Sequence, residues 1–179
     1  MAHIVVLGAG LGGTIMAYEM QSKLRREDRL TVVNLGSVYS FIPSNPWVAV
    51  GWRDREEISV DLTKTLSRRG IALRPEGAKR VHPAENRIEL NDGSSIDYDY
   101  LIIATGPDLA FDEVPGLGPA GYTQSVCHID HATAAKDEVD RLMKKPGPVI
   151  IGAVQGASCY GPAYEFAFIL DTALRRARI

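Results

Sequence analysis

The chain has 179 residues, of which 45% are hydrophobic and 23% are charged, and its net charge at pH 7 is −2. This composition is ordinary for a soluble globular protein and gives no electrostatic case for binding nucleic acid. No apolar run approaches the roughly 20 residues that span a bilayer. Because the first expected strand begins at His3, we expect no secretory signal, which favours a cytoplasmic protein.

The N-terminal residues have the pattern of a βαβ unit. A buried-strand pattern at His3–Leu7 runs into the glycine turn at residues 8–13, whose sequence GAGLGG satisfies G-x-G-x-x-G. Helical patterning over Thr14–Arg26 and a second strand pattern at Leu30–Leu35 complete the unit. In such units a pyrophosphate binds where the glycine turn opens the helix. The arrangement predicts a Rossmann-like dinucleotide site.

Three glycines of this turn have separate expected roles, and one residue departs from the usual pattern. We expect Gly8 to allow the tight turn, Gly10 to admit the pyrophosphate, and Gly13 to let the helix and strand pack closely. The second strand of such units usually ends in an acid that binds the ribose hydroxyls, whereas this strand ends with Asn34. Because an amide can donate and accept hydrogen bonds, we expect ribose contact with less charge.

The middle of the chain is expected to extend this unit. In residues 36–52, Pro43 and Pro46 argue against a central strand or helix, and the aromatic residues predict an ordered loop that packs on the sheet or covers a ligand. A buried strand is expected from Tyr98 to Gly106, ending in A-T-G. Between them we expect a short helix at 61–69, a strand at 71–73, and a hairpin of 87–90 and 95–98 around a turn at 91–93.

The chain has two cysteines, Cys127 and Cys159. In a cytoplasmic protein, two distant thiols are by default small buried hydrophobes. Cys159, however, lies just before a Gly-Pro pair and a helical pattern at Ala163–Arg176, and a helix N-terminus favours the thiolate that attacks in exchange reactions. Glu165 would lie in the first turn of that helix, where it either accepts a proton or serves as ordinary capping electrostatics.

Cys127 is followed by two histidines, His128 and His131. Asp130 is expected to cap a helix that runs from about His131 to Lys144. At this helix start His131 either tunes the thiol and moves protons or is a surface histidine. We expect no metal site, because no C-x-x-C spacing is present.

A second glycine turn follows an expected strand at Val149–Ile151. It begins Gly152-Ala153-Val154, so that Val154 stands where G-x-G requires glycine. A valine side chain there would obstruct the approach of a pyrophosphate to the backbone. The pattern predicts a second Rossmann-like unit whose nicotinamide site does not work.

The motifs GAGLGG and YDYLIIATG, at residues 8–13 and 98–106, together resemble the two flavin signatures of two-dinucleotide-binding-domain flavoproteins. The stretches PSNPWVAVGW, VCHIDHA and GASCYGPAYEF resemble the sulfide:quinone oxidoreductases within that group. The resemblance covers the whole chain and implies the N-terminal part of such an enzyme. Its implied α/β fold is a Rossmann-like FAD-binding domain with a parallel sheet plus a β-hairpin layer at residues 1–110, then the start of a second Rossmann-like domain at residues 111–179.

The resemblance also implies FAD as cofactor and a set of site residues. In the family, sulfide attacks a redox-active cysteine pair, here Cys159 and a partner downstream of residue 179, while a cysteine matching Cys127 acts near the flavin or in sulfur release. With the neighbouring groups considered above, the candidate catalytic residues are Cys159, Cys127, His131 and Glu165. The implied FAD contacts are Gly8, Ala9, Gly10, Leu11, Gly12, Asn34, Leu35, Ile42, Pro43, Ala78, Thr105, Gly106 and Ala110.

The implied partners are sulfide, a quinone, and a membrane surface reached through a C-terminal part beyond this chain, with homo-oligomerisation as a further expectation. The full-length protein would then be cytoplasmic and peripheral to the membrane. Two alternatives stay open. A type II NADH:quinone oxidoreductase shares the architecture but needs glycine at Val154, and the chain could instead be a non-catalytic flavin-binding fragment.

Overall fold

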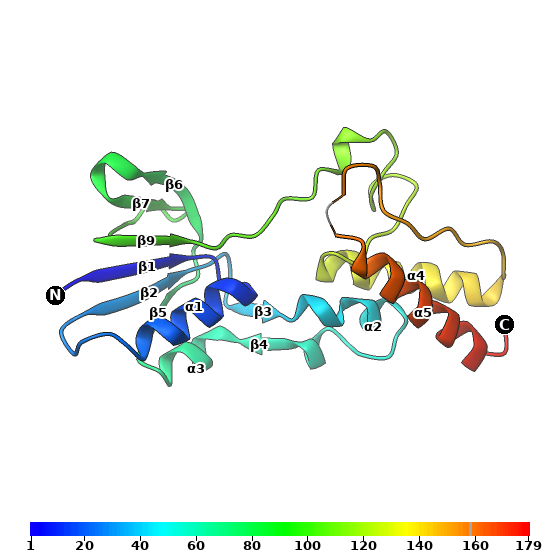
Figure 1. Ribbon diagram of the computed structural model, residues 1–179, viewed down its shortest axis with the longest axis horizontal. Helices are drawn as coiled ribbons and strands as arrows, with labels where there is room; N and C mark the ends of the chain where they lie inside the picture. Colours follow the sequence, from blue (N-terminus) through cyan, green and yellow to red (C-terminus); the bar gives the residue numbers. More distant parts are fainter. Residues whose placement is uncertain (158) are drawn as a thin grey trace. The chain divides into compact units, whose positions relative to one another are not determined.

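The computed structural model of the chain describes residues 1–157 and 159–179. Ser158, in the quoted GASCYGPAYEF stretch, lies outside the described residues. The chain forms two compact units, the first from residues 1–39 and 59–108 and the second from residues 40–58 and 109–179 (Figure 1). The division into domains at residue 110 stays a prediction.

The first unit is built on a four-stranded parallel sheet with the order β5-β2-β1-β9. In its register Val5 lies beside Thr31 on one side and beside Leu101 on the other. The carboxyl ends of β1, β2 and β9 therefore meet at one edge, as the sequence predicted. The strands are β1 (His3–Leu7), β2 (Arg29–Val33), β5 (Ala72–Arg74) and β9 (Tyr100–Ile103).

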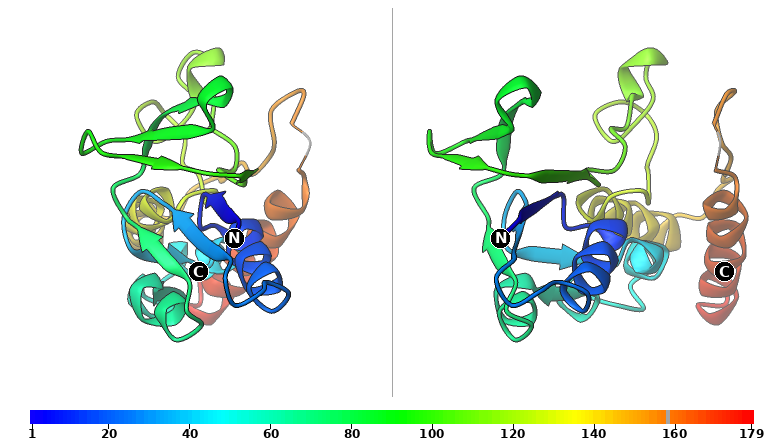
Figure 2. Two further views of the ribbon diagram at one scale, coloured as in Figure 1. Left: turned by 90° about the vertical axis from the view of Figure 1, so that its left-hand side faces the viewer. Right: turned by 60° about the vertical axis from the view of Figure 1, so that its left-hand side comes forward.

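Each face of this sheet is covered by a different layer (Figures 1 and 2). Ile4 and Val6 of β1 pack in a core with residues of the helices, whereas Val5 and Leu7 pack in a core with residues of an antiparallel sheet. This alternation is the two-residue period of a strand that is buried on both faces. The helices are α1 (Leu11–Gln21) and α3 (Leu62–Ser67), and the antiparallel strands are β6 (Ala78–His82), β7 (Arg87–Leu90) and β8 (Ser95–Asp97).

Residues 36–52 contain more regular structure than the sequence predicted. The expectation that Pro43 and Pro46 exclude a helix was wrong, because each proline lies in the first turn of a short helix, where its missing N–H has no intrahelical acceptor to lose. The elements of this segment are β3 (Val38–Ser40), which pairs with β4 (Ser59–Asp61), the 3₁₀ turn η1 (Ile42–Ser44) and α2 (Asn45–Ala49). Elsewhere in the chain lie the 3₁₀ turns η2 (Glu56–Ile58), η3 (Pro83–Glu85) and η4 (Phe111–Glu113).

Helix α1 begins three residues earlier and ends five residues earlier than the expected Thr14–Arg26. Its end is fixed by the chain that follows, because the Asp28 carboxylate accepts hydrogen bonds from the backbone N–H groups of Ala2 and Arg25. These bonds lower the pKa of Asp28, with the bond from Ala2 as the largest cause. The turn at residues 22–28 is thus tied to the start of β1.

The second unit packs α2 against two longer helices, α4 (Ile129–Lys144) and α5 (Gly161–Arg176). Its core contains Val48 and Ala49 of α2 together with Ile129 and Ala132 of α4. A second cluster joins α4 to α5 through Val139 and Leu170. Each helix of this unit thus buries one face, on which its apolar residues recur at helical spacing.

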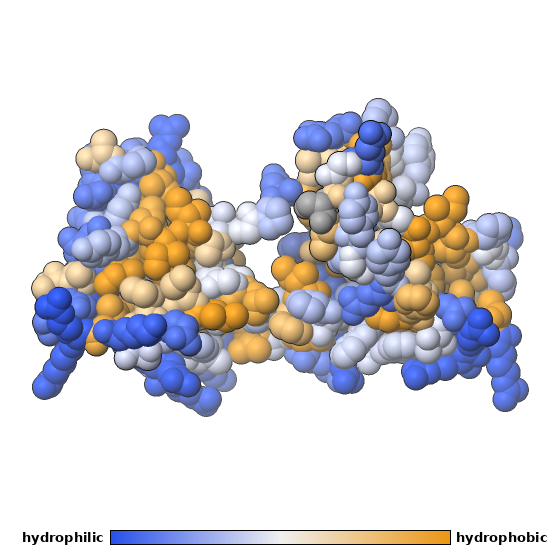
Figure 3. All heavy atoms as spheres, viewed as in Figure 1, coloured by the Kyte–Doolittle hydropathy of each residue, from blue (hydrophilic) through white to orange (hydrophobic). Residues whose placement is uncertain are grey.

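Three expectations for this unit were wrong. Residues 149–151 form no strand, and Ile150 is 95% exposed, since no described strand lies beside them. Figure 3 shows apolar side chains at the surface over this segment, which leads into α5. The cap of α4 is His128, not Asp130, because the His128 ring accepts a hydrogen bond from the Asp130 N–H. Because α5 begins at Gly161, Glu165 lies beyond the first turn.

Candidate functional site

Backbone atoms surround two glycines of the first glycine turn. Gly8 has φ +98°, and a Cβ at this position would fall on the backbone of Ala104 and Thr105. A Cβ at Gly13 would fall on the carbonyl oxygen of Gly8. The expected tight turn at Gly8 and close packing at Gly13 are therefore present. At Gly10, by contrast, a Cβ would stand in open space, which is where a ligand can approach the backbone.

The N-terminus of α1 suits an anion. Its N-cap residue is Gly10, which offers no side chain, and no acidic residue lies in the first turn. The first N–H groups of a helix have no intrahelical acceptor, and the helix dipole adds partial positive charge there. The turn therefore fits the pyrophosphate of a dinucleotide, which would meet N–H groups and no competing carboxylate.

A cavity of about 410 Å³ opens beside this turn. None of its lining residues is acidic, and the one lysine among them, Lys79, donates a hydrogen bond to Glu89 at 2.7 Å. This bond is the largest cause of the lowered pKa of Glu89. The cavity is lined by Leu7, Gly8, Val33, Asn34, Leu35, Gly77, Ala78, Lys79, Arg80, Val81, Asn91 and Thr105.

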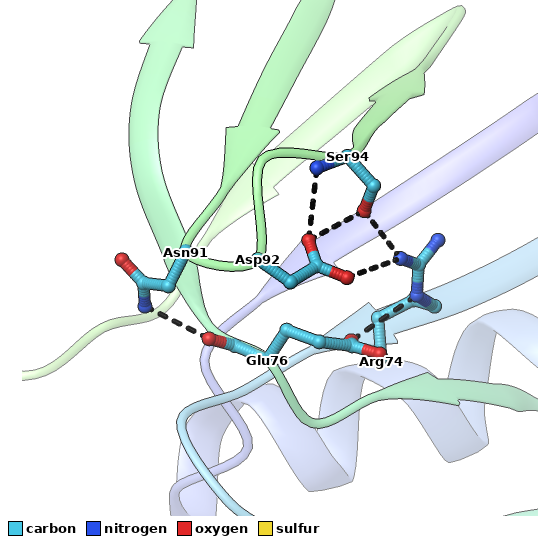
Figure 4. Close-up of polar contacts among 5 residues, drawn as sticks. All are labelled: Arg74, Glu76, Asn91, Asp92 and Ser94. Carbon is cyan, nitrogen blue, oxygen red and sulfur yellow. Dashed lines mark hydrogen bonds and ion pairs between the residues drawn. The ribbon is translucent and has the colours of Figure 1, made fainter.

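A polar network holds one wall of the cavity (Figure 4). Arg74, at the end of β5, donates to the Glu76 carboxylate at 3.1 Å and to the Ser94 hydroxyl at 2.8 Å. Ser94 donates to Asp92 from its hydroxyl and its N–H, and these two bonds lower the pKa of Asp92. Asn91 donates to the Glu76 carbonyl at 2.8 Å. The β7–β8 turn is thereby fixed to the end of the parallel sheet.

The structure gathers five of the expected FAD contacts in this cavity: Gly8, Asn34, Leu35, Ala78 and Thr105. Gly10, Leu11 and Gly12 are exposed in the adjoining turn, and Gly106 follows Thr105 with φ +76°. The expected contacts at Ile42, Pro43 and Ala110 belong to the second unit, where all three are exposed, and their role stays a prediction.

Sequence reasoning missed the other seven lining residues, which are Leu7, Val33, Gly77, Lys79, Arg80, Val81 and Asn91. The signal for Asn91 was present, because it opens the N-D-G turn that was predicted. Gly77 could have been suspected from its need for a positive φ of 73°, yet a lone glycine in a connecting segment gives no reason to place it at a ligand site.

Both thiols are free and exposed, which excludes the interpretation of Cys127 and Cys159 as buried hydrophobes. Cys159 lies two residues before the start of α5, and its neighbour Tyr160 is the N-cap. No capping side chain and no first-turn acid stand at this helix end. Cys159 therefore lies before a helix start, as expected, while its catalytic role stays a prediction.

Cys127 is held by its backbone neighbours. Its N–H donates to the Ser125 hydroxyl at 3.1 Å. The carbonyl of Val126 accepts a hydrogen bond at 3.0 Å from the side chain of Asn45, which is fully buried at the start of α2. No local sequence pattern indicates the role of Asn45, because its partner lies 81 residues away.

His131 lies in a group of rings and charges at the start of α4. Its ring centroid is 5.4 Å from the rings of both Phe111 and His128. The Asp130 carboxylate pairs with Arg55 and lies 3.5 Å from the His128 ring. His131 Nδ1 is buried without a described hydrogen-bond partner. This group excludes the interpretation of His131 as an isolated surface histidine, while its catalytic role stays a prediction.

The parallel sheet, the glycine turn and the uncapped α1 define a dinucleotide-binding α/β protein. Residues 2–161 match the family model described as pyridine nucleotide-disulphide oxidoreductase, and the chain belongs to this family. The chain is 38% identical over 99% of its length to a sulfide-quinone reductase of Aquifex aeolicus, and 28% identical over 98% of its length to a mitochondrial sulfide:quinone oxidoreductase of Dictyostelium discoideum. It spans 40% and 39% of these two relatives.

Solved structures give the same result. The sulfide:quinone oxidoreductase of Aquifex aeolicus matches 98% of this chain with a TM-score of 0.92 and 38% identity, over 40% of its own chain. A NAD-dependent persulfide reductase from A. fulgidus matches 96% of this chain at 19% identity and a TM-score of 0.72, over 32% of its own chain, which shows a shared fold alone. The resemblance and the α/β fold predicted from sequence are confirmed. Among the described residues, no helix has the length and apolar character needed to cross a membrane.

Proposed function

We propose that this chain carries the FAD-binding turn and a reactive thiol of an FAD-dependent sulfide:quinone oxidoreductase. One observation carries the proposal: the exposed Cys159 stands at the uncapped N-terminus of α5, after a turn in which Val154 replaces the glycine that a nicotinamide site needs. The similarity to the sulfide-quinone reductase of Aquifex aeolicus over 99% of the chain supports it.

The first unit fits FAD because Gly8 of the glycine turn lines the acid-free cavity, and the open space at Gly10 and the start of α1 follow directly in the chain. The residues proposed to form the FAD site are the turn at residues 8–12, the strand ends at 34–35 and 105–106, and Ala78. The resemblance adds Ile42, Pro43 and Ala110. When bound, FAD would accept the two electrons that sulfide releases and pass them to a quinone.

Cys159 is the proposed sulfur acceptor. In the oxidised protein it would form a disulfide with a partner cysteine outside this chain. Hydrosulfide attacks the Cys159 sulfur, the new S–S bond forms as the old one breaks, and the partner leaves as a thiolate. The partial positive charge at the N-terminus of α5 would favour the anionic hydrosulfide that approaches Cys159.

The remaining candidate residues would serve proton and sulfur transfer around this step. His131 and Glu165 are the proposed proton acceptors for the hydrosulfide that enters, and Cys127 is the proposed site of sulfur release. The membrane surface and a homo-oligomer remain proposed partners of the full-length protein, on the resemblance alone.

Anaerobic stopped-flow mixing tests the proposal in the full-length, FAD-loaded protein. Sulfide should bleach the flavin absorption band, whereas NADH should not. Cys159→Ala should abolish bleaching by sulfide without changing the FAD content, because the cradle lies in the other unit. Bleaching by NADH alone would favour the NADH:quinone oxidoreductase, and a protein that binds FAD but responds to neither reductant would be a flavin-binding module.

A further inference from the structure

Asn34 occupies the position at which dinucleotide folds usually carry an acid. Its Oδ1 accepts a hydrogen bond from the Ala9 N–H at 2.9 Å, and its Nδ2 donates to the carbonyl oxygens of Leu35 at 3.2 Å and Gly36 at 3.0 Å. Because Ala9 N can only donate and the two carbonyls can only accept, the amide has one possible orientation. Both of its N–H groups and one acceptor lone pair are therefore occupied by backbone.

These bonds close the glycine turn from one side. Other bonds hold the same segment: the Gly8 N–H donates to the Val33 carbonyl at 2.8 Å, and the Thr14 hydroxyl donates to the Ala9 carbonyl at 3.0 Å. Ala9 is only 3% exposed. Its N–H is bonded to Asn34 within the protein and thus serves the shape of the turn.

We propose that Asn34 is a positioning residue of the nucleotide site, which holds the glycine turn in its binding shape instead of binding the ribose. The inference rests on the proposed FAD site. An aspartate would keep the acceptor for the Ala9 N–H. It would, however, lose both donors and place a carboxylate against the carbonyl oxygens of Leu35 and Gly36, so that repulsion replaces two hydrogen bonds. This explains why an amide stands where an acid is usual.

Asn34→Asp separates positioning from ribose binding, because aspartate is the usual ribose ligand. We would titrate FAD into the purified apoprotein of wild type, Asn34→Asp and Asn34→Ala. If Asn34 positions the turn, both substitutions raise the FAD dissociation constant about tenfold or more, as expected for the loss of one or two net hydrogen bonds. If Asn34 binds ribose, Asn34→Asp binds FAD as tightly as wild type or more tightly, and the inference is overturned.

A matched control removes the effect of added negative charge. Asn86 lies in the same unit, is exposed, and is not among the residues that line the cavity. Asn86→Asp adds the same charge and should change the dissociation constant less than about threefold. A loss as large as that of Asn34→Asp would show that charge, and not the closure of the turn, explains the effect, and would overturn the inference.

A second readout does not depend on the stability of the turn. The affinities of ADP and 2′-deoxy-ADP, measured by competition with FAD, should keep the same ratio in wild type and Asn34→Ala, because the amide makes no ribose contact. A ratio that collapses in Asn34→Ala would overturn the inference. Wild-type apoprotein that binds neither FAD nor ADP would instead overturn the proposed cofactor site itself. If Asn34→Ala does not fold, the nearly isosteric Asn34→Asp carries the test.

Discussion

The two glycine-rich turns of the chain, residues 8–13 and 152–156, begin alike in sequence and differ in structure. In the first, backbone atoms of Gly8 and Ala104 stand where side chains would begin, so the glycines are required by packing. In the second, no strand precedes the turn, and a Cβ at Gly152 would meet nothing within 4 Å. A glycine motif therefore indicates a nucleotide cradle only when neighbouring strands close around it.

The helices that follow these turns differ less than the turns do. Both α1 and α5 begin without a capping side chain and without a first-turn acid. The first turn of α1 has free N–H groups, whereas in α5 Pro162 has no N–H and the Ala163 N–H donates to the Tyr160 carbonyl. Both helix starts share the partial positive charge of the helix dipole. The residue before each helix differs, because Gly10 leaves open space before α1 and Cys159 places a thiol before α5. The same local electrostatics can thus serve a bound phosphate in one unit and an anionic sulfur in the other.

The largest effect is expected from Gly10→Val, which tests whether the first turn alone is a nucleotide cradle. Gly10 has φ −67°, a conformation open to valine, and its Cβ would occupy the open space of the site. The apoprotein should fold, whereas the FAD dissociation constant should rise at least about 100-fold, or about 2.7 kcal/mol. Isothermal titration measures it, with Gly152→Val as the matched control that leaves FAD affinity unchanged. A Gly10→Val protein that still purifies yellow would contradict the cradle.

Gly13→Ala tests the packing side of the comparison. Helix propensity alone predicts that alanine stabilises a helix by about 1 kcal/mol relative to glycine. Here its Cβ would fall on the Gly8 carbonyl oxygen, so we expect a net loss of about 1–3 kcal/mol. Gly152→Ala in the second turn should change the free energy of unfolding by less than about 0.5 kcal/mol. Urea denaturation gives the free energy of unfolding of both variants. A Gly13→Ala protein more stable than wild type would refute the packing argument.

Asn45→Ala tests how the second unit holds the Cys127 segment, whose anchor is a buried side chain instead of a closed turn. The substitution leaves the partly buried Val126 carbonyl without its donor, which costs about 2 kcal/mol. The exposed amide Asn91, which also donates to a backbone carbonyl, should cost less than about 1 kcal/mol when changed to alanine. Denaturation gives both values, and hydrogen exchange at residues 126–127 should rise only in Asn45→Ala. Equal losses of unfolding free energy in Asn45→Ala and Asn91→Ala would contradict the role of Asn45 as a buried anchor.

The sequence predicted the first unit well because its signals are local. Strand periodicity, the glycine turn and the N-D-G turn each depend on neighbouring residues, and the parallel sheet and hairpin layer followed from them. The errors have a different origin. Residues 149–151 have strand composition, yet a strand also needs a partner, which composition does not contain. The bonds of Asn34 to Ala9 and of Asn45 to Val126 join residues 25 and 81 positions apart, so that no local pattern could indicate them.

The smallest expected effect is the pH dependence of stability that His3 gives to the first unit. His3 begins β1, the strand that carries the first turn, and its Nε2 lies 2.8 Å from the Thr31 hydroxyl. Burial, and then the charge of Arg29, lower the pKa of His3 below its usual 6.5. The folded protein therefore binds this proton less readily than the unfolded chain, so that stability is full above about pH 6.5 and falls as the pH drops towards the lowered pKa. His3→Gln cannot titrate and should show a shallower loss of unfolding free energy between about pH 7.5 and pH 5. Urea denaturation at several pH values in this range measures how steeply the unfolding free energy falls, and hydrogen exchange of the β1 amides tests whether the loss lies in β1. Identical pH slopes in wild type and His3→Gln would exclude His3 as the source.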